Sequence, residues 1–184
     1  FQPLADGRIL IAESGAGRLI EIDREGRIHR EIKLVVDRSD AHTDTRLVRK
    51  LGNGHYLVCH EGDGKLREYD GGGKVVWEYE VPMFGKEAAG GHGPEAFGNK
   101  LFSAVRLKSG NTLIATGNGH SVLEVTPGKE VVWELHQKDL DGIVLRGGIV
   151  DVVDHAIPDL EDLHPVVFFR AQARRVYGDD VVDQ

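Results

Sequence analysis

Hydrophobic and polar positions follow one plan three times along this chain. The stretch from Gly54 to Val81 has the pattern of three short strands with glycine-rich turns between them, and the same pattern begins at Gly7 and at Gly110. The copies align without a gap, so these glycines coincide, as do Leu10, Leu57 and Leu113; Glu21, Glu68 and Glu124; and Glu31, Glu78 and Glu134. Repeats built only of strands and turns predict an array of small sheets, each of which needs a neighbour to bury its faces.

A further strand precedes the aligned glycine of each unit. It covers residues 45–51 in the second unit and 101–107 in the third, whereas residues 1–5 leave room for only a short strand in the first. A complete unit therefore has four strands, which we call a, b, c and d in chain order. The expected units cover approximately residues 1–34, 45–81 and 101–137.

Strands b and d of each unit distribute their apolar residues differently. Strand b is nearly continuous in apolar residues, as expected of a strand that is buried on both faces. Strand d alternates, so that Val75, Trp77 and Tyr79 share one face while Glu78 and Glu80 point away. Charge on the solvent face is typical of an outermost strand, because an uncharged edge pairs with other chains.

This order of units predicts an all-β, β-propeller-type array of four-stranded antiparallel blades over residues 1–143. A propeller needs about four to eight blades to close, so about three units make a partial one. After Ile143 the repeat ends, and residues 144–184 form an irregular or helical tail. Two hypotheses stay open for this tail: a separate cap with a short helix after Pro165, or the product of a shifted reading frame near Ile143.

Composition and charge exclude some classes of partner. The chain has 40% hydrophobic and 29% charged residues and a formal net charge of -7. This balance argues against a nucleic-acid or anionic-membrane partner, since phosphate binding needs clustered Lys and Arg. No apolar run is long enough to span a bilayer. The one cysteine, Cys59, excludes an internal disulfide, and a small buried side chain is its simplest interpretation.

The turn before strand d carries a family resemblance. Asp70, Gly73, Lys74 and Trp77 in YDGGGKVVWEYEV resemble the tryptophan-docking blades of the PQQ-like, or quinoprotein-like, β-propeller superfamily. The phrases LGNGHYLV, LKSGNTLI and VLEVTPGKEVVWEL look like its bacterial branch of arylsulfotransferase-like and uncharacterised proteins. The resemblance implies a bacterial protein, exported to the periplasm or the cell exterior. It implies two enzymatic activities, a PQQ-dependent dehydrogenase and a sulfotransferase, but the vicinal cysteine pair of the dehydrogenases is missing, so PQQ is not supported.

Propeller geometry indicates where a site would lie. The links from strand d to the next strand a, residues 35–44 and 82–100, open on the same face as the turns from b to c. We call this face the rim. Its candidate ligand-binding or metal-ligating residues are His42, His60, Glu61, His92, Glu95, Asn118 and His120, with Glu13, Asp44 and Asp63 nearby. Histidines and carboxylates on one rim can bind a divalent metal or a polar ligand; the alternative is a set of solvated turn residues.

The long link 82–100 gives His92 and Glu95 the first place among these candidates, because loops of this length are commonly functional. No catalytic motif is recognisable among the histidines. We therefore predict a non-catalytic binding or scaffolding module whose ligand or partner lies on the rim. The alternative is a fragment of a PQQ-like propeller enzyme. Self-association, or blades supplied from elsewhere, would close the ring.

Overall fold

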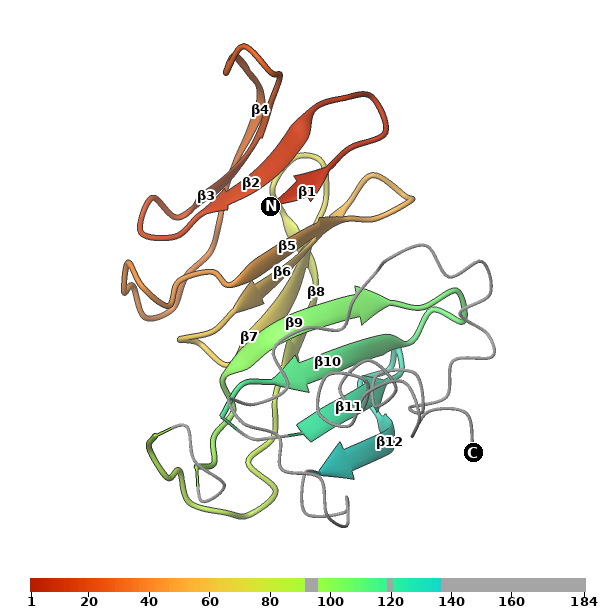
Figure 1. Cartoon of the computed structure of the whole chain (residues 1–184). Coiled ribbons are helices and arrows are strands. Elements are labelled where there is room, and N and C mark those ends of the chain that lie inside the picture. Colours follow the sequence, from red (N-terminus) through yellow and green to blue (C-terminus); the bar gives the residue numbers. More distant parts are fainter. Residues whose placement is uncertain (92–95, 119–120, 137–184) are drawn as a thin grey trace, which may run out of the picture.

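The computed structural model describes residues 1–91, 96–118 and 121–136. Strands in these residues form three four-stranded antiparallel sheets, which we call blades 1 to 3, stacked in chain order with blades 1 and 3 at opposite ends (Figure 1). Blade 1 consists of β1 (Gln2–Pro3), β2 (Ile9–Glu13), β3 (Arg18–Ile22) and β4 (Ile28–Lys33). Blade 2 consists of β5 (Leu47–Lys50), β6 (Tyr56–His60), β7 (Lys65–Tyr69) and β8 (Val75–Glu80). Blade 3 consists of β9 (Leu101–Arg106), β10 (Thr112–Thr116), β11 (Ser121–Val125) and β12 (Val131–His136).

This architecture confirms the predicted all-β fold of about three propeller-type blades. Strands a to d pair in chain order in every blade, and the sheets of the described residues do not close into a ring. The hypotheses for residues 144–184 concern residues outside the described part of the chain. Within that part, no helix is long and apolar enough to cross a membrane.

The aligned glycines owe their recurrence to the turn from strand a to strand b. Gly7, Gly54 and Gly110 have φ angles of 84°, 85° and 90°. Residues that carry a side chain rarely adopt this left-handed backbone conformation, whereas glycine does so without a steric penalty. Each of these N–H groups donates to a carbonyl three residues earlier, and Gly54 donates to Leu51 at 2.9 Å. The glycine therefore fixes the same tight turn in every blade.

Two hydrophobic cores lie between the blades. Blade 1 contributes Leu10, Leu19, Ile32 and Leu34 to the first core, and blade 2 contributes Val48, Tyr56, Val58 and Tyr69. The second core joins Leu57, Cys59, Leu66, Tyr79 and Val81 of blade 2 to Leu101, Ala104, Ile114, Leu123 and Val125 of blade 3. Blade 2 thus buries both of its faces, and all five residues of β6 are buried. The free thiol of Cys59 is fully buried, which confirms its prediction as a core residue.

Polar contacts cross both blade boundaries at equivalent positions. Glu21 of blade 1 pairs with Lys50 of blade 2 at 2.6 Å, and Glu68 of blade 2 pairs with Arg106 of blade 3 at 2.7 Å. Both acceptors lie on strand c, and both cations end strand a of the following blade. Because the repeat places them in the same register, these pairs set the same alignment of neighbouring blades twice.

The tryptophan position of strand d makes a second repeated contact. Trp77 donates its indole N–H to the carbonyl oxygen of Pro127, in the turn of the next blade, at 2.9 Å. The half-buried Trp77 side chain packs against the second core, so its prediction as a blade-packing residue is confirmed. Arg30 holds the same position in blade 1 and donates to the Gly71 carbonyl at 2.8 Å.

Candidate functional site

The rim is held together by backbone hydrogen bonds between the links and the turns. Gly62, in the b–c turn of blade 2, donates to the Thr43 carbonyl of the link 35–44 at 2.8 Å. Gly117, in the corresponding turn of blade 3, donates to the Lys100 carbonyl at 2.8 Å. Each link is therefore fastened to the b–c turn of the blade that follows it.

A charged cluster lies where these two blades meet on the rim. Glu61 is 4% exposed, and its carboxylate lies 3.1 Å from Arg46 Nε and 3.7 Å from Lys100 Nζ. The side chains of Arg46 and Lys100 are 37% and 47% exposed. The Arg46 guanidinium stacks on Phe102, 4.4 Å from the ring centroid, a favourable cation–π geometry. Solvent thus reaches both cations while the carboxylate that holds them is covered.

Two oxygens of this cluster lack hydrogen-bond partners in the described part of the chain. One is Glu61 Oε2, which lies within ion-pair distance of Arg46 but makes no aligned hydrogen bond. The other is the buried hydroxyl of Thr45, which directly precedes Arg46. Buried polar groups are nearly always paired, because an unmade bond costs about 1–3 kcal/mol. Glu61 Oε2 therefore retains acceptor capacity beside the Arg46 guanidinium.

Small residues create the space for this packing. A Cβ atom added to Gly117 would lie 2.3 Å from the Phe102 ring, so the ring rests directly on the backbone. A Cβ atom on Gly98 would lie 2.3 Å from the Asn118 amide. Asn118 Oδ1 in turn accepts the backbone N–H of Lys100 at 3.2 Å. The cluster therefore depends on glycine at two places and on an asparagine that holds the entry of β9.

The structure brings two of the predicted site residues together. Glu61 and Asn118 both contact Lys100, the first through its side chain and the second through its backbone. Sequence analysis did not identify Arg46, Lys100 or Phe102, since they lie at the beginnings of β5 and β9 rather than in the turns. The predicted residues His92, Glu95 and His120 lie outside the described part of the chain.

The two described histidine candidates do not join this cluster. His42 is exposed, and its backbone N–H donates to Asp40. His60 is fully buried, with Nδ1 donating to the Asp44 carbonyl at 2.9 Å and Nε2 lying 2.9 Å from the Tyr69 hydroxyl. Desolvation, followed by the nearby charge of Arg67, lowers the pKa of His60 to about 4, so the imidazole is neutral at pH 7.

The other carboxylates near the rim are occupied as well. Glu13 pairs with Arg18, Asp44 accepts the backbone N–H of Asp40, and Asp63 pairs with Arg67. Among residues 1–91, 96–118 and 121–136, no three or more His, Cys, Asp or Glu side chains gather as metal ligands would. The predicted metal site includes three residues beyond these ranges and stays a prediction.

A second ion-pair network, which sequence analysis missed, lies around the fully buried Arg67. This guanidinium pairs with Asp63 at 2.6 Å, Glu78 at 2.7 Å and Asp37 at 2.8 Å. It also donates to the Val35 carbonyl at 2.8 Å. Desolvation opposes the charge, but the hydrogen bonds to Asp63 and Glu78 outweigh it and raise the pKa of Arg67. The network fastens the link 35–44 to blade 2.

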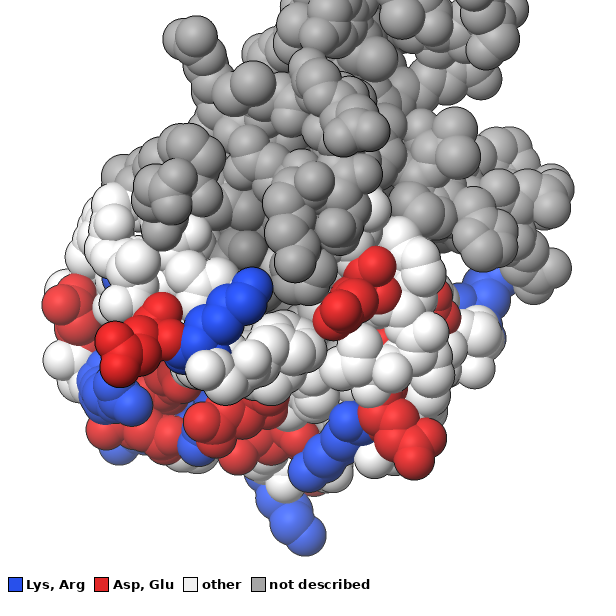
Figure 2. Space-filling view, turned by 90° about the horizontal axis from the view of Figure 1, so that it is seen from below, with Lys and Arg blue, Asp and Glu red and all other residues white. Residues whose placement is uncertain are grey.

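On the face seen in Figure 2, acidic and basic side chains lie beside one another. Neither sign forms a broad patch on that face. This mixture agrees with a chain whose charged residues pair within and between blades, as they do around Arg67 and Glu61.

The family described as outer membrane protein assembly factor BamB, with PQQ-like repeats, matches residues 2–166. The chain belongs to this family. The PQQ-like superfamily proposed from the turn before strand d is thereby confirmed. No curated protein matches the chain.

Solved structures show the same fold. A protein of unknown function from Bacteroides caccae has 20% identity and a TM-score of 0.60, covering 78% of this chain and 47% of its own. Virginiamycin B lyase from Staphylococcus aureus has 13% identity and a TM-score of 0.50, covering 73% and 39%. The WD40 β-propeller domain of Doa1 has 15% identity and a TM-score of 0.50, covering 72% and 38%. The chain thus spans less than half the length of each of these structures.

Proposed function

We propose that this chain is a non-catalytic propeller module that binds a protein partner on the rim, at the cluster of Arg46, Glu61, Lys100 and Phe102. The single observation that carries the proposal is the pairing of two partly exposed cations with one buried carboxylate. Two positive charges and one negative charge leave a net positive charge beside an aromatic ring. Such a surface suits an acidic side chain of a partner, with an apolar neighbour to cover the ring.

The family description supports a binding role, because it names an assembly factor rather than an enzyme. The superfamily resemblance adds export from a bacterial cytoplasm to this proposal. Likeness to the lyase from Staphylococcus aureus concerns the fold alone, since folds host many functions. The enzymatic alternative gains no support from the described residues.

The test uses an acetylated, amidated peptide that alternates aspartate and phenylalanine. Titration of the ¹⁵N-labelled full chain is expected to shift the backbone signals of Arg46, Lys100 and Phe102. Arg46→Gln removes the stacked cation and is expected to weaken peptide binding by about tenfold, the effect of one charge-assisted contact. Arg38→Gln is the matched control, because Arg38 is exposed on the link 35–44 and has no ion pair with Glu61.

Equal binding by the wild type and Arg46→Gln would contradict the proposal. So would signal shifts confined to residues away from blades 2 and 3. A lysine-and-phenylalanine peptide of the same length tests the sign of the charge, and it is expected not to bind.

A further inference from the structure

The outward face of blade 1 carries a row of isoleucines. Ile9, Ile11 and Ile22 are partly exposed, and Ile28 is 50% exposed. The equivalent residues of blade 2 are Tyr56, Val58, Tyr69 and Val75, which pack against blade 1. Those of blade 3 include Ile114 and Val125, which are fully buried against blade 2. In blades 2 and 3 this face therefore packs against the preceding blade.

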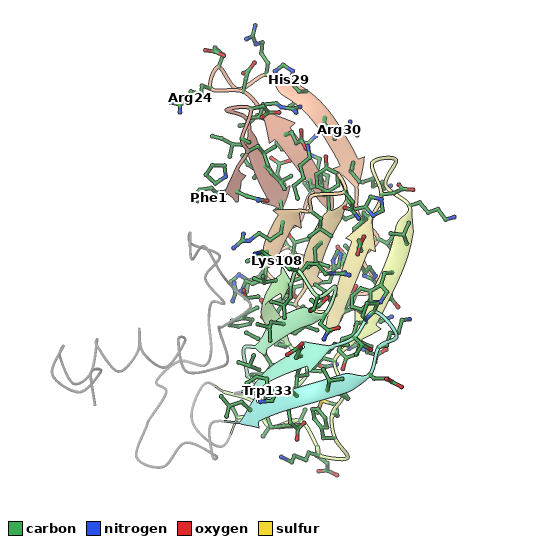
Figure 3. The ribbon with its side chains drawn as sticks, turned by 90° about the vertical axis from the view of Figure 1, so that its right-hand side faces the viewer. Phe1, Arg24, His29, Arg30, Lys108 and Trp133 are labelled. Carbon is green, nitrogen blue, oxygen red and sulfur yellow. The ribbon has the colours of Figure 1, made fainter. Side chains whose placement is uncertain are left out.

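The opposite face of blade 3 has the complementary features. Leu113 and Leu135 are partly exposed, whereas the equivalent Leu57 and Tyr79 of blade 2 are buried by blade 3. Within the described residues, the indole N–H of Trp133 has no acceptor, although the equivalent Trp77 donates to the next blade. Figure 3 shows Trp133 at one end of the stack and Phe1, Arg24 and Arg30 at the other.

Glu124 shows what else this face lacks. Its carboxylate accepts a hydrogen bond from Asn111 of its own blade at 2.7 Å, and it is only partly buried. Glu21 and Glu68 hold the same position and bind Lys50 and Arg106 of the following blade. No cation from a following blade reaches Glu124 among the described residues.

We propose that two copies of this chain associate head to tail, with the open face of blade 3 in one copy covering the isoleucine face of blade 1 in the other. A second copy is the expected partner because this contact would repeat the two interfaces inside the chain. In those interfaces the carbonyl oxygens of Gly71 and Pro127 accept a hydrogen bond from strand d of the preceding blade. Arg24 occupies the equivalent turn position in blade 1. The Arg24 carbonyl oxygen thus accepts the indole N–H of Trp133 of the second copy. With the three described blades in each copy, two such contacts would join six described blades into one closed arrangement.

One element of the repeated interface is missing from this contact. Pro3 stands where Lys50 and Arg106 stand in blades 2 and 3, so blade 1 presents no cation to Glu124. The association is therefore weaker than the contacts within the chain. A basic residue at position 3 is expected to complete the interface.

Sedimentation velocity of the full chain over a wide concentration range tests the proposal. The wild type is expected to pass from one copy to two as its concentration rises. Ile28→Asp and Trp133→Ala are each expected to weaken association by more than about tenfold, since each removes a central contact of the face. An equimolar mixture of these two variants is expected to regain association, because one intact head-to-tail contact remains between the different copies.

Pro3→Lys is expected to strengthen the association of two copies, a result that a folding defect cannot produce. It is expected to tighten association by roughly threefold to tenfold, the range for one interfacial ion pair. Pro3→Lys combined with Glu124→Gln is the matched control, and it is expected to lose that gain. Circular dichroism melting verifies that every variant is folded.

Three outcomes overturn the proposal. The first is a wild type that stays a single copy at all concentrations together with a Pro3→Lys variant that does the same. The second is a dimer that Ile28→Asp disrupts and Trp133→Ala leaves unchanged, which would mean contact between two blade 1 faces. The third is a mixture of the two variants that fails to associate although the wild type does.

Discussion

The imidazole of His60 and the hydroxyl of Tyr69 lie 2.9 Å apart between β6 and β7, sealed from solvent. Because His60 Nδ1 donates to the Asp44 carbonyl, Nε2 of the neutral ring accepts from the tyrosine. Burial also raises the pKa of Tyr69 to about 12, so this hydroxyl keeps its proton at physiological pH. The pair links strands b and c of blade 2 to the link that enters the blade.

The buried His60 makes stability depend on pH. Its pKa is about 4 in the folded chain and 6.5 in the unfolded one, so the unfolded state binds the proton first. Stability from this residue is complete above about pH 6.5 and is lost as the pH falls toward 4, with a maximum loss of about 3 kcal/mol.

Urea unfolding of the wild type and of His60→Gln at pH 7 and pH 5 measures this effect. The wild type is expected to lose more stability between these pH values than the variant. His42→Gln is the control, since His42 is exposed, and it is expected to keep the wild-type pH dependence. Parallel losses in the wild type and His60→Gln would contradict the assignment.

Arg67 is expected to be the most costly charged residue to remove. Arg67→Met leaves Asp63, whose side chain is fully buried, without its cation, and breaking such a pair costs about 3–5 kcal/mol. Lys65→Met is the comparison, because Lys65 pairs with the same Asp37 and Glu78 from a more exposed position. Its loss is expected to cost less than about 1 kcal/mol. Guanidinium unfolding at neutral pH compares them; similar costs would show that the network is not energetically centred on Arg67.

Gly117 is expected to tolerate no side chain. In Gly117→Ala the new methyl group collides with the Phe102 ring, and overpacking of this kind costs about 1–3 kcal/mol. Gly52→Ala is the control, because a Cβ atom there has no neighbour within 4 Å. In a double-mutant cycle, Phe102→Ala is expected to remove most of the cost of Gly117→Ala. Additive losses would place the clash elsewhere.

The thiol of Cys59 is expected to be inert in the folded chain. Desolvation raises its pKa far above the usual range, so almost no thiolate forms at pH 8. Ellman's reagent is expected to label no cysteine in native protein and one cysteine per chain in urea. Rapid labelling without urea would mean that the interface between blades 2 and 3 opens readily.

The repeat made the fold predictable because each of its signals has a local cause. The turn at Gly54 and at its equivalents needs a left-handed backbone, which glycine adopts without strain, and the continuous apolar run of β6 needs two covered faces. Trp77 was correctly placed in the blade packing for the same reason. These features act within one unit, so aligning the units reveals them.

The site was less predictable because its contacts lie between units. Glu61 and Asn118 were identified from their turns, but Arg46 and Lys100 reach Glu61 only through the relative placement of two blades. His60 occupies the same aligned position as Glu13 and Thr116, at the end of strand b, so polarity there indicated the rim. The strand instead turns the imidazole into the core.

The alignment of the three units contains a signal for the buried position of Arg67. It occupies the strand c position that Ile20 and Leu123 hold in the other units, where the side chains are buried. A charged residue at such an apolar position requires buried partners, because an unpaired charge there is costly. The carboxylates Asp63 and Glu78 supply them within the same blade.

Blade 2 is the one described blade that is covered on both sides, and this has a consequence for hydrogen exchange. Local opening is easiest where few buried contacts hold a segment, so amide protons of β6 and β7 are the last to exchange. Both blade interfaces join neighbours in sequence, so blades 1 and 2 can pack while a ribosome is still adding blade 3. Protection against hydrogen exchange is therefore expected to build up in chain order during synthesis. Blade 2 is fully protected only after blade 3 has packed against it.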